Sequence, residues 1–282
     1  MTSYDDGYGR PQPQVSFPPL TPWVRRLLIA NVTVFVFLMV VGLGSLGLQS
    51  TVIDLFGLDP DMWRSYVPAV WQLGTYAFLH DMGGLGHLLF NMLVLYFFGT
   101  MLEGIIGSRR FITHYMGAAM AGGLLHLVVE LSKGNEAYLP AIGASGAVMG
   151  VVVATATLRP HTQVLFIFIP VKLWVMAALY VASDLYPLIR ELSGAGRSGN
   201  VAHIIHLGGA LYGFLGARYG LLMKDPWAIL ERKRAVAAAE RSLGDRQRLD
   251  ALLEKINREG IGSLSRSEKA FLKKASERGQ QR

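Results

Sequence analysis

Ala141-Ile142-Gly143-Ala144-Ser145-Gly146-Ala147 is the stretch that decides how the whole chain is interpreted. It is a run of small residues with one hydroxyl, and it leads directly into an apolar run from Val148 to Leu158. Gly143 and Gly146 permit close backbone approach, although glycine weakens a helix. A serine between glycines at the start of an apolar helix is therefore expected to serve chemistry rather than stability.

The composition is typical of a polytopic membrane protein. Of the 282 residues, 51% are hydrophobic, the mean hydropathy is +0.34, and the apolar residues form long blocks. The chain has no cysteine, which excludes disulfides, Cys-based zinc sites and thiol nucleophiles. The net charge of +7 does not indicate a nucleic-acid partner, because 15 of the 27 Lys and Arg follow Met223 and many others flank apolar blocks.

The apolar blocks predict six membrane spans. The expected fold class is therefore an all-α polytopic membrane protein, a six-helix bundle whose short fourth helix begins inside the membrane. The fifth span is interrupted early by Pro170 and Lys172. The predicted spans are Leu27 to Leu48, Leu85 to Ile106, Phe111 to Leu131, Ser145 to Leu158, a segment within Val164 to Leu188, and His203 to Met223.

Three parts of the chain are expected. Residues 1–22 are polar and proline-rich and predict a disordered tail, residues 23–223 form the membrane domain, and residues 224–282 form a soluble helical tail. In that last tail, Asp245 is expected to cap a helix that ends at Gly260. Ser265-x-x-Glu268 predicts a capping box for a final helix. The sequence indicates no partner for this tail.

The basic residues at the span ends predict the orientation. Lys and Arg concentrate on the cytoplasmic side of membrane proteins. Both termini are therefore expected in the cytoplasm, and the protein is expected to be a multi-pass integral membrane protein. The residues that fall on this side are Arg25, Arg26, Arg109, Arg110, Arg159, Arg218 and Lys224.

The short fourth span predicts the depth of Ser145. Fourteen helical residues cover about 21 Å, whereas the hydrocarbon core is about 30 Å thick. Because Arg159 holds the cytoplasmic end of this span, Ser145 is expected roughly 10 Å below the outer surface. Irregular backbone at that depth is tolerated only inside protein or beside water. We therefore expect a water-filled cavity that opens outward.

Two other spans carry polar side chains at a similar depth. His87 and Asn91 lie four residues apart and share one face of the second span. In the sixth span, His206 lies on a stripe with Gly209 and Gly213, which is suited to backbone contact with the fourth span. This contact would direct His206 toward Ser145, whereas His203 lies nearly one turn further out.

These residues together predict acyl transfer. A serine hydroxyl becomes a nucleophile when a histidine takes its proton, and His206 is the expected base for Ser145. Free N–H groups at the start of a helix favour an oxyanion, and His87 and Asn91 supply further donors. The expected reaction is hydrolysis of a peptide bond with water from the cavity.

Three motifs resemble the signatures of rhomboid intramembrane serine proteases, in the same order and across roughly residues 24–222. They are His87-Leu88-Leu89-Phe90-Asn91, Gly143-Ala144-Ser145-Gly146 and His206-x-x-Gly209-x-x-x-Gly213. The resemblance implies that Ser145 is the nucleophile and His206 the general base, as a dyad without a third acid. It also implies an oxyanion hole formed by His87, Asn91 and the Ser145 amide.

The same resemblance implies the setting of the reaction. Substrates would be transmembrane proteins that enter from the lipid bilayer, and neither a cofactor nor a metal is expected. Similarity to compact six-span members places the chain in a bacterial inner membrane. Gly99-x-x-x-Glu103 also resembles the end of the family's second span.

The chain departs from the family pattern at four places. His80 and His87 are two residues further apart than is usual in the family. Met149 stands where many members have an aromatic residue against the base, and a thioether orients an imidazole less firmly. Gln72, after Trp71, replaces an arginine and cannot form its ion pairs. Ile205 replaces the alanine that usually precedes the base.

Two alternatives belong to other functional classes. One is a catalytically silent relative that binds membrane proteins, although such relatives typically lack the serine or the histidine. The other is a metal-dependent membrane hydrolase that uses His80, His87, His203 and His206. It is disfavoured because the sequence has no HExxH motif and the spans show no carboxylate beside those histidines in the outer half.

Overall fold

The computed structural model describes residues 18–65, 69–132, 140–166, 169–193 and 201–280. The expected N-terminal tail lies outside these residues, apart from 18–22. The chain divides into two compact units, Met1–Lys224 and Asp225–Arg282, and each is described by itself.

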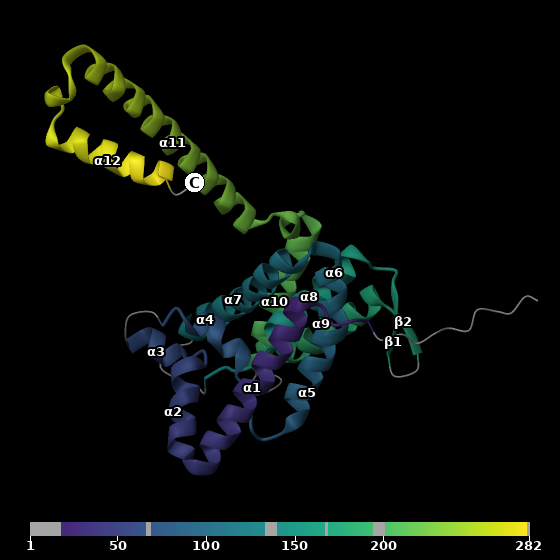
Figure 1. Ribbon diagram of the computed structural model, residues 1–282. Coiled ribbons are helices and arrows are strands. Elements are labelled where there is room, and N and C mark those ends of the chain that lie inside the picture. Colours follow the sequence, from purple (N-terminus) through teal and green to yellow (C-terminus); the bar gives the residue numbers. More distant parts are fainter. Residues whose placement is uncertain (1–17, 66–68, 133–139, 167–168, 194–200, 281–282) are drawn as a thin grey trace, which may run out of the picture. The chain divides into compact units, whose positions relative to one another are not determined.

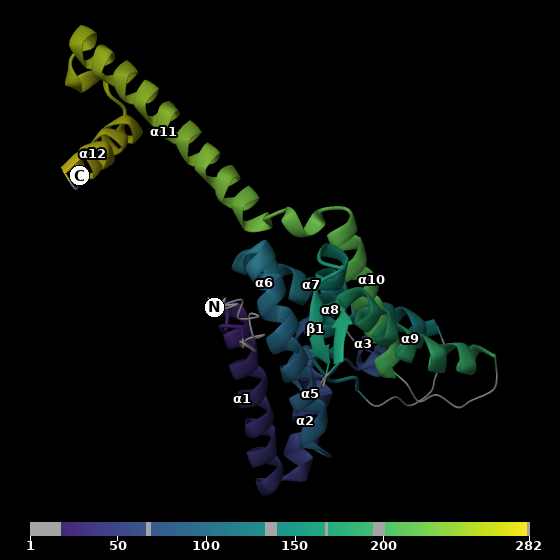
Figure 2. The same ribbon diagram turned by 90° about the vertical axis from the view of Figure 1, so that its right-hand side faces the viewer.

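The first unit is a bundle of helices, which confirms the expected fold class (Figures 1 and 2). A π-helical turn, Leu95–Gly99, joins α5 to α6, and short 3-10 helices lie at Tyr76–Phe78 and Leu221–Met223. Its helices are α1 (Pro22–Gly44), α2 (Leu46–Phe56), α3 (Pro60–Ser65), α4 (Gln72–Thr75), α5 (Leu85–Val94), α6 (Thr100–Ile106), α7 (Ser108–Ser132), α8 (Ser145–Leu158), α9 (Leu173–Leu192) and α10 (Val201–Arg218).

Three described helical segments are long and apolar enough to cross a membrane: Pro22–Gly44, Leu85–Ile106 and Ser108–Ser132. The second of these confirms the predicted span, and α8 begins and ends at the predicted residues. The number of six spans stays a prediction.

The first predicted span is wrong at its end. Helix α1 stops at Gly44, and a second helix, α2, begins after Ser45. The Ser45 hydroxyl accepts a hydrogen bond from the Leu48 N–H at 3.2 Å, as a helix N-cap does. Two glycines shortly before this serine weaken α1, so apolar character alone placed the boundary too late.

The start of the fifth predicted span is also different. Residues Gln163–Phe166 (β1) and Ile169–Lys172 (β2) form an antiparallel hairpin in which Leu165 pairs with Pro170, and α9 begins only at Leu173. Proline lacks the N–H group that hydrogen-bonds in a helix interior. Both strands of a two-stranded sheet are edge strands, and edge strands tolerate proline. The aromatic and β-branched residues of this stretch also favour strands.

Helix α8 is the centre of the bundle. Its residues from Ser145 to Ala156 are all buried, and α5, α6, α7, α9 and α10 contact it (Figures 1 and 2). The glycine contact with α10 is confirmed. A methyl group on Gly209 or Gly213 would collide with the carbonyl oxygen of Gly146 or Gly150. The two backbones therefore touch at two positions about one helical turn apart.

Gln72 anchors the loop between α1 and α5 without an ion pair. Its side chain is fully buried, and its Oε1 accepts hydrogen bonds from Trp63 Nε1 (3.0 Å) and the Asp59 N–H (3.3 Å). Its Nε2 donates to the carbonyl oxygens of Asp54 (3.2 Å) and Leu55 (3.3 Å). A side-chain amide can both donate and accept hydrogen bonds, so it can satisfy the two donors and the two acceptors around Gln72. An arginine could only donate.

Glu103 caps the first helix from the end of α6. Its carboxylate accepts hydrogen bonds from the N–H groups of Trp23 and Val24 at 3.0 to 3.1 Å. The hydroxyls of Thr21 (2.5 Å) and Ser108 (2.6 Å) donate to it as well. Free N–H groups and the helix dipole favour an anion at this position. The contact joins the ends of α1, α6 and α7.

The second unit contains α11 (Pro226–Glu259), a short 3-10 helix (Ile261–Ser263) and α12 (Arg266–Gln280). The expected cap at Asp245 is wrong, because that residue lies inside α11 and Asp225 caps the helix instead. The Asp225 carboxylate accepts from the N–H groups of Trp227 (2.9 Å) and Ala228 (3.1 Å). Alanines before position 240 are strong helix formers, so nothing interrupts the helix there. Gly260 ends α11 as predicted.

The predicted capping box at the start of α12 is confirmed. The Ser265 N–H donates to the Glu268 carboxylate at 2.6 Å, and the Glu268 N–H donates to the Ser265 hydroxyl at 3.2 Å. Lys255 of α11 donates to the same carboxylate at 3.2 Å. The backbone N–H of Ser265, followed by its hydroxyl and by Lys255, lowers the pKa of Glu268 below its ordinary value.

This depressed pKa predicts acid sensitivity of α12. Ionised Glu268 stabilises the folded tail fully above the glutamate's unfolded pKa, about 4.3, and that contribution is lost as the pH falls through the lower folded value. Amide hydrogen exchange of α12 peptides should therefore accelerate below about pH 4.3 relative to Glu268→Gln. The variant Glu277→Gln, in an exposed position of the same helix, should behave like the wild type. Equal acid responses of the wild type and Glu268→Gln would contradict the prediction.

Candidate active site

The Gly143 backbone sets the position of Ser145 at the start of α8. Gly143 has φ of +134°, in a region that favours glycine, and its N–H donates to the Tyr76 carbonyl oxygen at 3.0 Å. Just before it, Ala141 and Leu58 exchange two backbone hydrogen bonds of 2.9 Å. The loop is thereby fixed, and Ser145 follows as the first residue of α8 with 8% of its surface exposed.

The contact between α8 and α10 brings the neighbours of Ser145 and His206 together. A methyl group on Gly146 would lie 2.6 Å from Ile205 Cγ2 and 3.2 Å from the Ile205 carbonyl oxygen. Ile205, which replaces the usual alanine, therefore packs directly on the residue that follows the serine. The glycine stripe thus has the place predicted for it, on the face of α10 that meets the start of α8.

The structure corrects the expectation that no acid accompanies the histidines. Asp184 of α9 is 4% exposed, and its Oδ1 lies 3.0 Å from Nδ1 of His206 and 2.5 Å from Nδ1 of His203. A carboxylate therefore does lie beside two of the histidines. Sequence reasoning missed it although an ionisable residue within an apolar span is a recognised signal of function.

These hydrogen bonds define the free atom of His206. An ionised carboxylate only accepts, so both Nδ1 atoms carry hydrogen. In neutral His206 the lone pair is then on Nε2, which is buried and has no hydrogen-bond partner among the described residues. The ring is thus arranged to accept a proton at Nε2.

His87 borders the loop that carries the serine. A methyl group on Gly143 would lie 3.1 Å from His87 Cε1 and 3.5 Å from Ser145 Oγ, so both side chains border this glycine. Asn91 is buried on the same face of α5, and its Nδ2 donates to the His87 carbonyl oxygen at 3.1 Å. One amide hydrogen of Asn91 is thereby used within its own helix, and its second remains available.

His80 packs against His87 despite the longer spacing. The ring centroids are 5.4 Å apart, and His80 is fully buried. Burial, followed by the electrostatic effect of His87, lowers the pKa of His80 to about 4. His80 is therefore neutral at neutral pH and adds no positive charge beside His87.

The aromatic neighbour of His206 comes from α9. The Tyr180 ring lies 6.4 Å from the His206 ring, centroid to centroid, and 6.5 Å from Phe90 of α5. Met149, at the position where many family members have an aromatic residue, is fully buried within α8. Tyr180 was not singled out from the sequence, because an aromatic residue in an apolar span is commonplace.

One group of side chains could also hold a metal ion. Single donor atoms of Asp184, His203 and His206 all lie within 4.8 Å of one another. Two imidazoles and a carboxylate are a common zinc set. The distances to the shared Asp184 oxygen are those of hydrogen bonds, however, and a nitrogen that donates to it cannot bind a metal at the same time.

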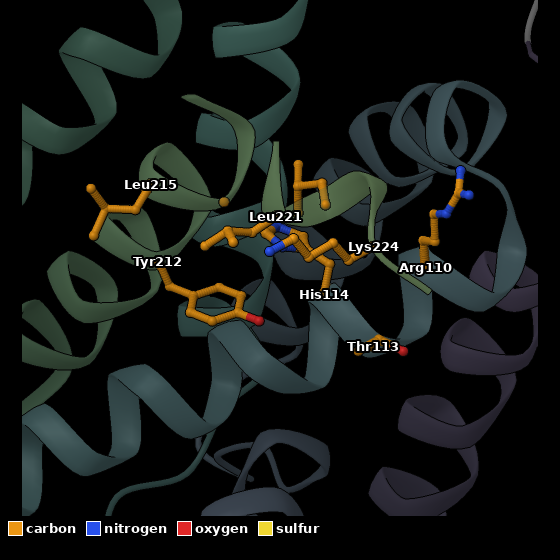
Figure 3. A pocket seen from close by; sticks show the side chains of 9 residues that line it. Arg110, Thr113, His114, Tyr212, Leu215, Leu221 and Lys224 are labelled. Carbon is orange, nitrogen blue, oxygen red and sulfur yellow. The ribbon is translucent and has the colours of Figure 1, made fainter. Parts of the chain in front are cut away.

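A separate cavity of about 170 Å³ lies near the start of α7 and the end of α10 (Figure 3). His114 stacks on Tyr212 there, with ring centroids 5.4 Å apart, and its Nε2 lies 3.3 Å from the Gly150 carbonyl oxygen. Arg110 and Lys224 also line it. None of the predicted site residues does, so this cavity is distinct from the predicted site.

Comparison with protein families gives two matches. The family model for the Rhomboid domain matches residues 68–222, which contain every predicted site residue. A second model, a family of unknown function (DUF6576), matches residues 240–278 in the C-terminal unit.

Curated relatives resemble the first unit. Rhomboid protein 1, mitochondrial, of Saccharomyces cerevisiae is 32% identical over 208 residues, which are 70% of this chain and 56% of that protein. Presenilin-associated rhomboid-like protein, mitochondrial, of Homo sapiens is 30% identical over 200 residues, 70% of this chain and 48% of that protein. RHOMBOID-like protein 12, mitochondrial, of Arabidopsis thaliana is 30% identical over 200 residues, 66% of this chain and 55% of that protein. The chain spans about half the length of the curated relatives it matches.

Proposed function

The chain belongs to the rhomboid family, and from this premise we propose that it is an intramembrane serine protease that hydrolyses a peptide bond in or near the transmembrane segments of other membrane proteins. Ser145 is the nucleophile and His206 the general base. His87, Asn91 and the Ser145 amide stabilise the oxyanion. The reaction requires neither a metal nor a cofactor.

The observation that carries this proposal is the close contact between the start of α8 and α10. Gly146 packs against Ile205 and Gly209, so the backbone positions of Ser145 and His206 lie next to this contact. Nε2 of His206 is buried and carries the free lone pair. Nucleophilic catalysis by serine requires a hydroxyl and a nearby imidazole nitrogen with a free lone pair. Ser145 and His206 offer these two groups on helices that contact each other.

The chemistry follows in two steps. The Ser145 hydroxyl gives its proton to Nε2 of His206 while Oγ attacks the scissile carbonyl carbon, and the oxyanion forms at the N-terminus of α8. His206 then gives this proton to the departing amine, which leaves an acyl-enzyme. Water hydrolyses the acyl-enzyme by the same route, and the proton of Ser145 is restored.

A serine-directed fluorophosphonate tests the proposal on detergent-solubilised protein. We expect the wild type to be labelled, Ser145→Ala and His206→Ala to lose the label, and His203→Ala to keep most of it. Equal labelling of all four proteins would contradict the dyad. No labelling of any of them would favour the catalytically silent, client-binding alternative.

The setting in the membrane is also a proposal. Basic residues flanking the spans support cytoplasmic termini, and in this orientation Ser145 would lie in the outer half of the bilayer. The three relatives described above carry mitochondrial names, whereas the compact span layout supports a bacterial inner membrane. Reporter fusions at both termini, assayed in bacterial cells, test the orientation.

A further inference from the structure

The Asp184 carboxylate is a buried group that the proposed dyad does not use. It lies on α9, is 4% exposed, and receives hydrogen bonds from both histidines of α10 at one oxygen. Burying a carboxylate is costly unless its hydrogen bonds are made. A site that retains such a group between two imidazoles is expected to use it.

We propose that Asp184 is a positioning residue that fixes the ring orientation and tautomer of His206, and that His203 holds Asp184 in place by donating to the same oxygen. This inference rests on the proposed serine protease function. It adds a third residue, Asp184, that accepts a hydrogen bond from Nδ1 of the dyad's His206. The acid of a soluble serine protease makes the same contact with its histidine.

The hydrogen-bond geometry supports this role. With its Nδ1–H bound to Asp184, His206 must present the Nε2 lone pair, which is the atom that takes the proton of Ser145. If the carboxylate is removed, the ring can carry its hydrogen on Nε2 instead, and that tautomer cannot act as a base. The Nδ1 proton stays on His206 throughout the reaction, and Asp184 stays ionised.

The positions of the two histidines assign them different roles. They are three residues apart on α10, and their rings are nearly perpendicular, at 83°. His206 adjoins Ile205, which packs against Gly146, whereas the His203 side chain is the more exposed, at 20% against 13%. His203 therefore supports the acid rather than the nucleophile.

Two further side chains, Tyr180 and His87, interact with His206. Tyr180 of α9 lies beside its ring, and His87 of α5 interacts with it electrostatically. The phenol of Tyr180 is on the same helix as Asp184, one turn earlier. Among the side chains that interact with His206 in the described structure, Asp184 is the one carboxylate.

The test compares Asp184→Asn with Ser183→Ala, an exposed neighbour on the same helix, in proteoliposomes with a transmembrane model substrate. We expect Asp184→Asn to lower kcat by roughly 10²- to 10⁴-fold with KM changed by less than about twofold, because positioning acts on the chemical step. His203→Ala should give a smaller loss in kcat. Ser183→Ala should match the wild type. An unchanged kcat in Asp184→Asn would overturn the inference, as would activity that a chelator abolishes and zinc restores.

A spectroscopic measurement covers the case in which Asp184→Asn folds poorly. In histidine-labelled Ser145→Ala protein, which keeps the Asp184–His206 pair, we expect a low-field proton resonance from the His206 Nδ1–H. It should disappear in the additional variant His206→Gln. Its absence from the Ser145→Ala protein would overturn the inference. Undiminished proteolysis by Ser145→Ala would refute the proposed function instead, so the two failures are distinguishable.

Discussion

Ser145→Ala is expected to abolish proteolysis, with the cleavage rate of a transmembrane substrate reduced by about 10⁵- to 10⁶-fold, the effect of removing the nucleophile from a soluble serine protease. The reason is that no other described hydroxyl lies at the start of α8, where the proposed mechanism places the oxyanion beside the free N–H groups. The measurement is the initial cleavage rate in proteoliposomes at several protein concentrations.

The control for this prediction is Ser183→Ala, which removes an exposed hydroxyl from α9 and should leave the cleavage rate unchanged. Thermal denaturation should show that the loss in Ser145→Ala is not a folding defect, because removing one hydroxyl from the first turn of α8 leaves the packing intact. A Ser145→Ala rate above about one hundredth of the wild-type rate would exclude Ser145 as the nucleophile, since residual catalysis by binding groups alone is far smaller.

Gly209→Ala is expected to have the largest structural effect. Its new methyl group would collide with the carbonyl oxygen of Gly146, and backbone on both sides leaves no flexible side chain to move. We expect α10 to be displaced from α8, at a cost of about 1–3 kcal/mol in the free energy of unfolding. Because a shift of about 1 Å at a catalytic group can cost a hundredfold in rate, activity should fall by at least that factor.

Gly104→Ala is the matched control for this substitution. It also lies in an apolar helical segment, but a methyl group there would meet no heavy atom within 4 Å. Alanine is the better helix former, so this variant should be as stable as the wild type or slightly more stable. Thermal melting in detergent measures both variants. A Gly209→Ala protein that melts with the wild type would mean that α8 and α10 do not pack backbone to backbone.

Local patterns predicted the helices that their own residues define. Helix α8 was correctly bounded, because glycines precede it and Arg159-Pro160 follows it. The glycine stripe of α10 correctly predicted its contact with α8, since small residues at four-residue spacing have one clear use in a membrane bundle. The capping box of α12 was predictable for the same reason, as it lies within four residues.

Two kinds of feature were not predictable from the sequence: where an apolar run changes from helix to another structure, and which side chains of different helices meet. Apolar character alone did not distinguish the β1–β2 hairpin from a helix, and Ser45 ended α1 within an apolar run. The Asp184 contact joins residues 22 positions apart on two helices, and no periodicity within one helix indicates which face of α9 meets α10. Asp184 is evident in the sequence as an acid within an apolar span, but its contact with His203 and His206 is not.

The burial of α8 from Ser145 to Ala156 has a consequence for how the protein is made. A segment of 14 residues is shorter than the roughly 20 that a helix needs to partition into a bilayer unaided. Because its sides contact protein, α8 has little surface with which lipid could hold it in place. Stable integration of α8 during synthesis is therefore expected to wait for its flanking helices, so that Ser145 reaches its buried position only once α10 has left the translocon.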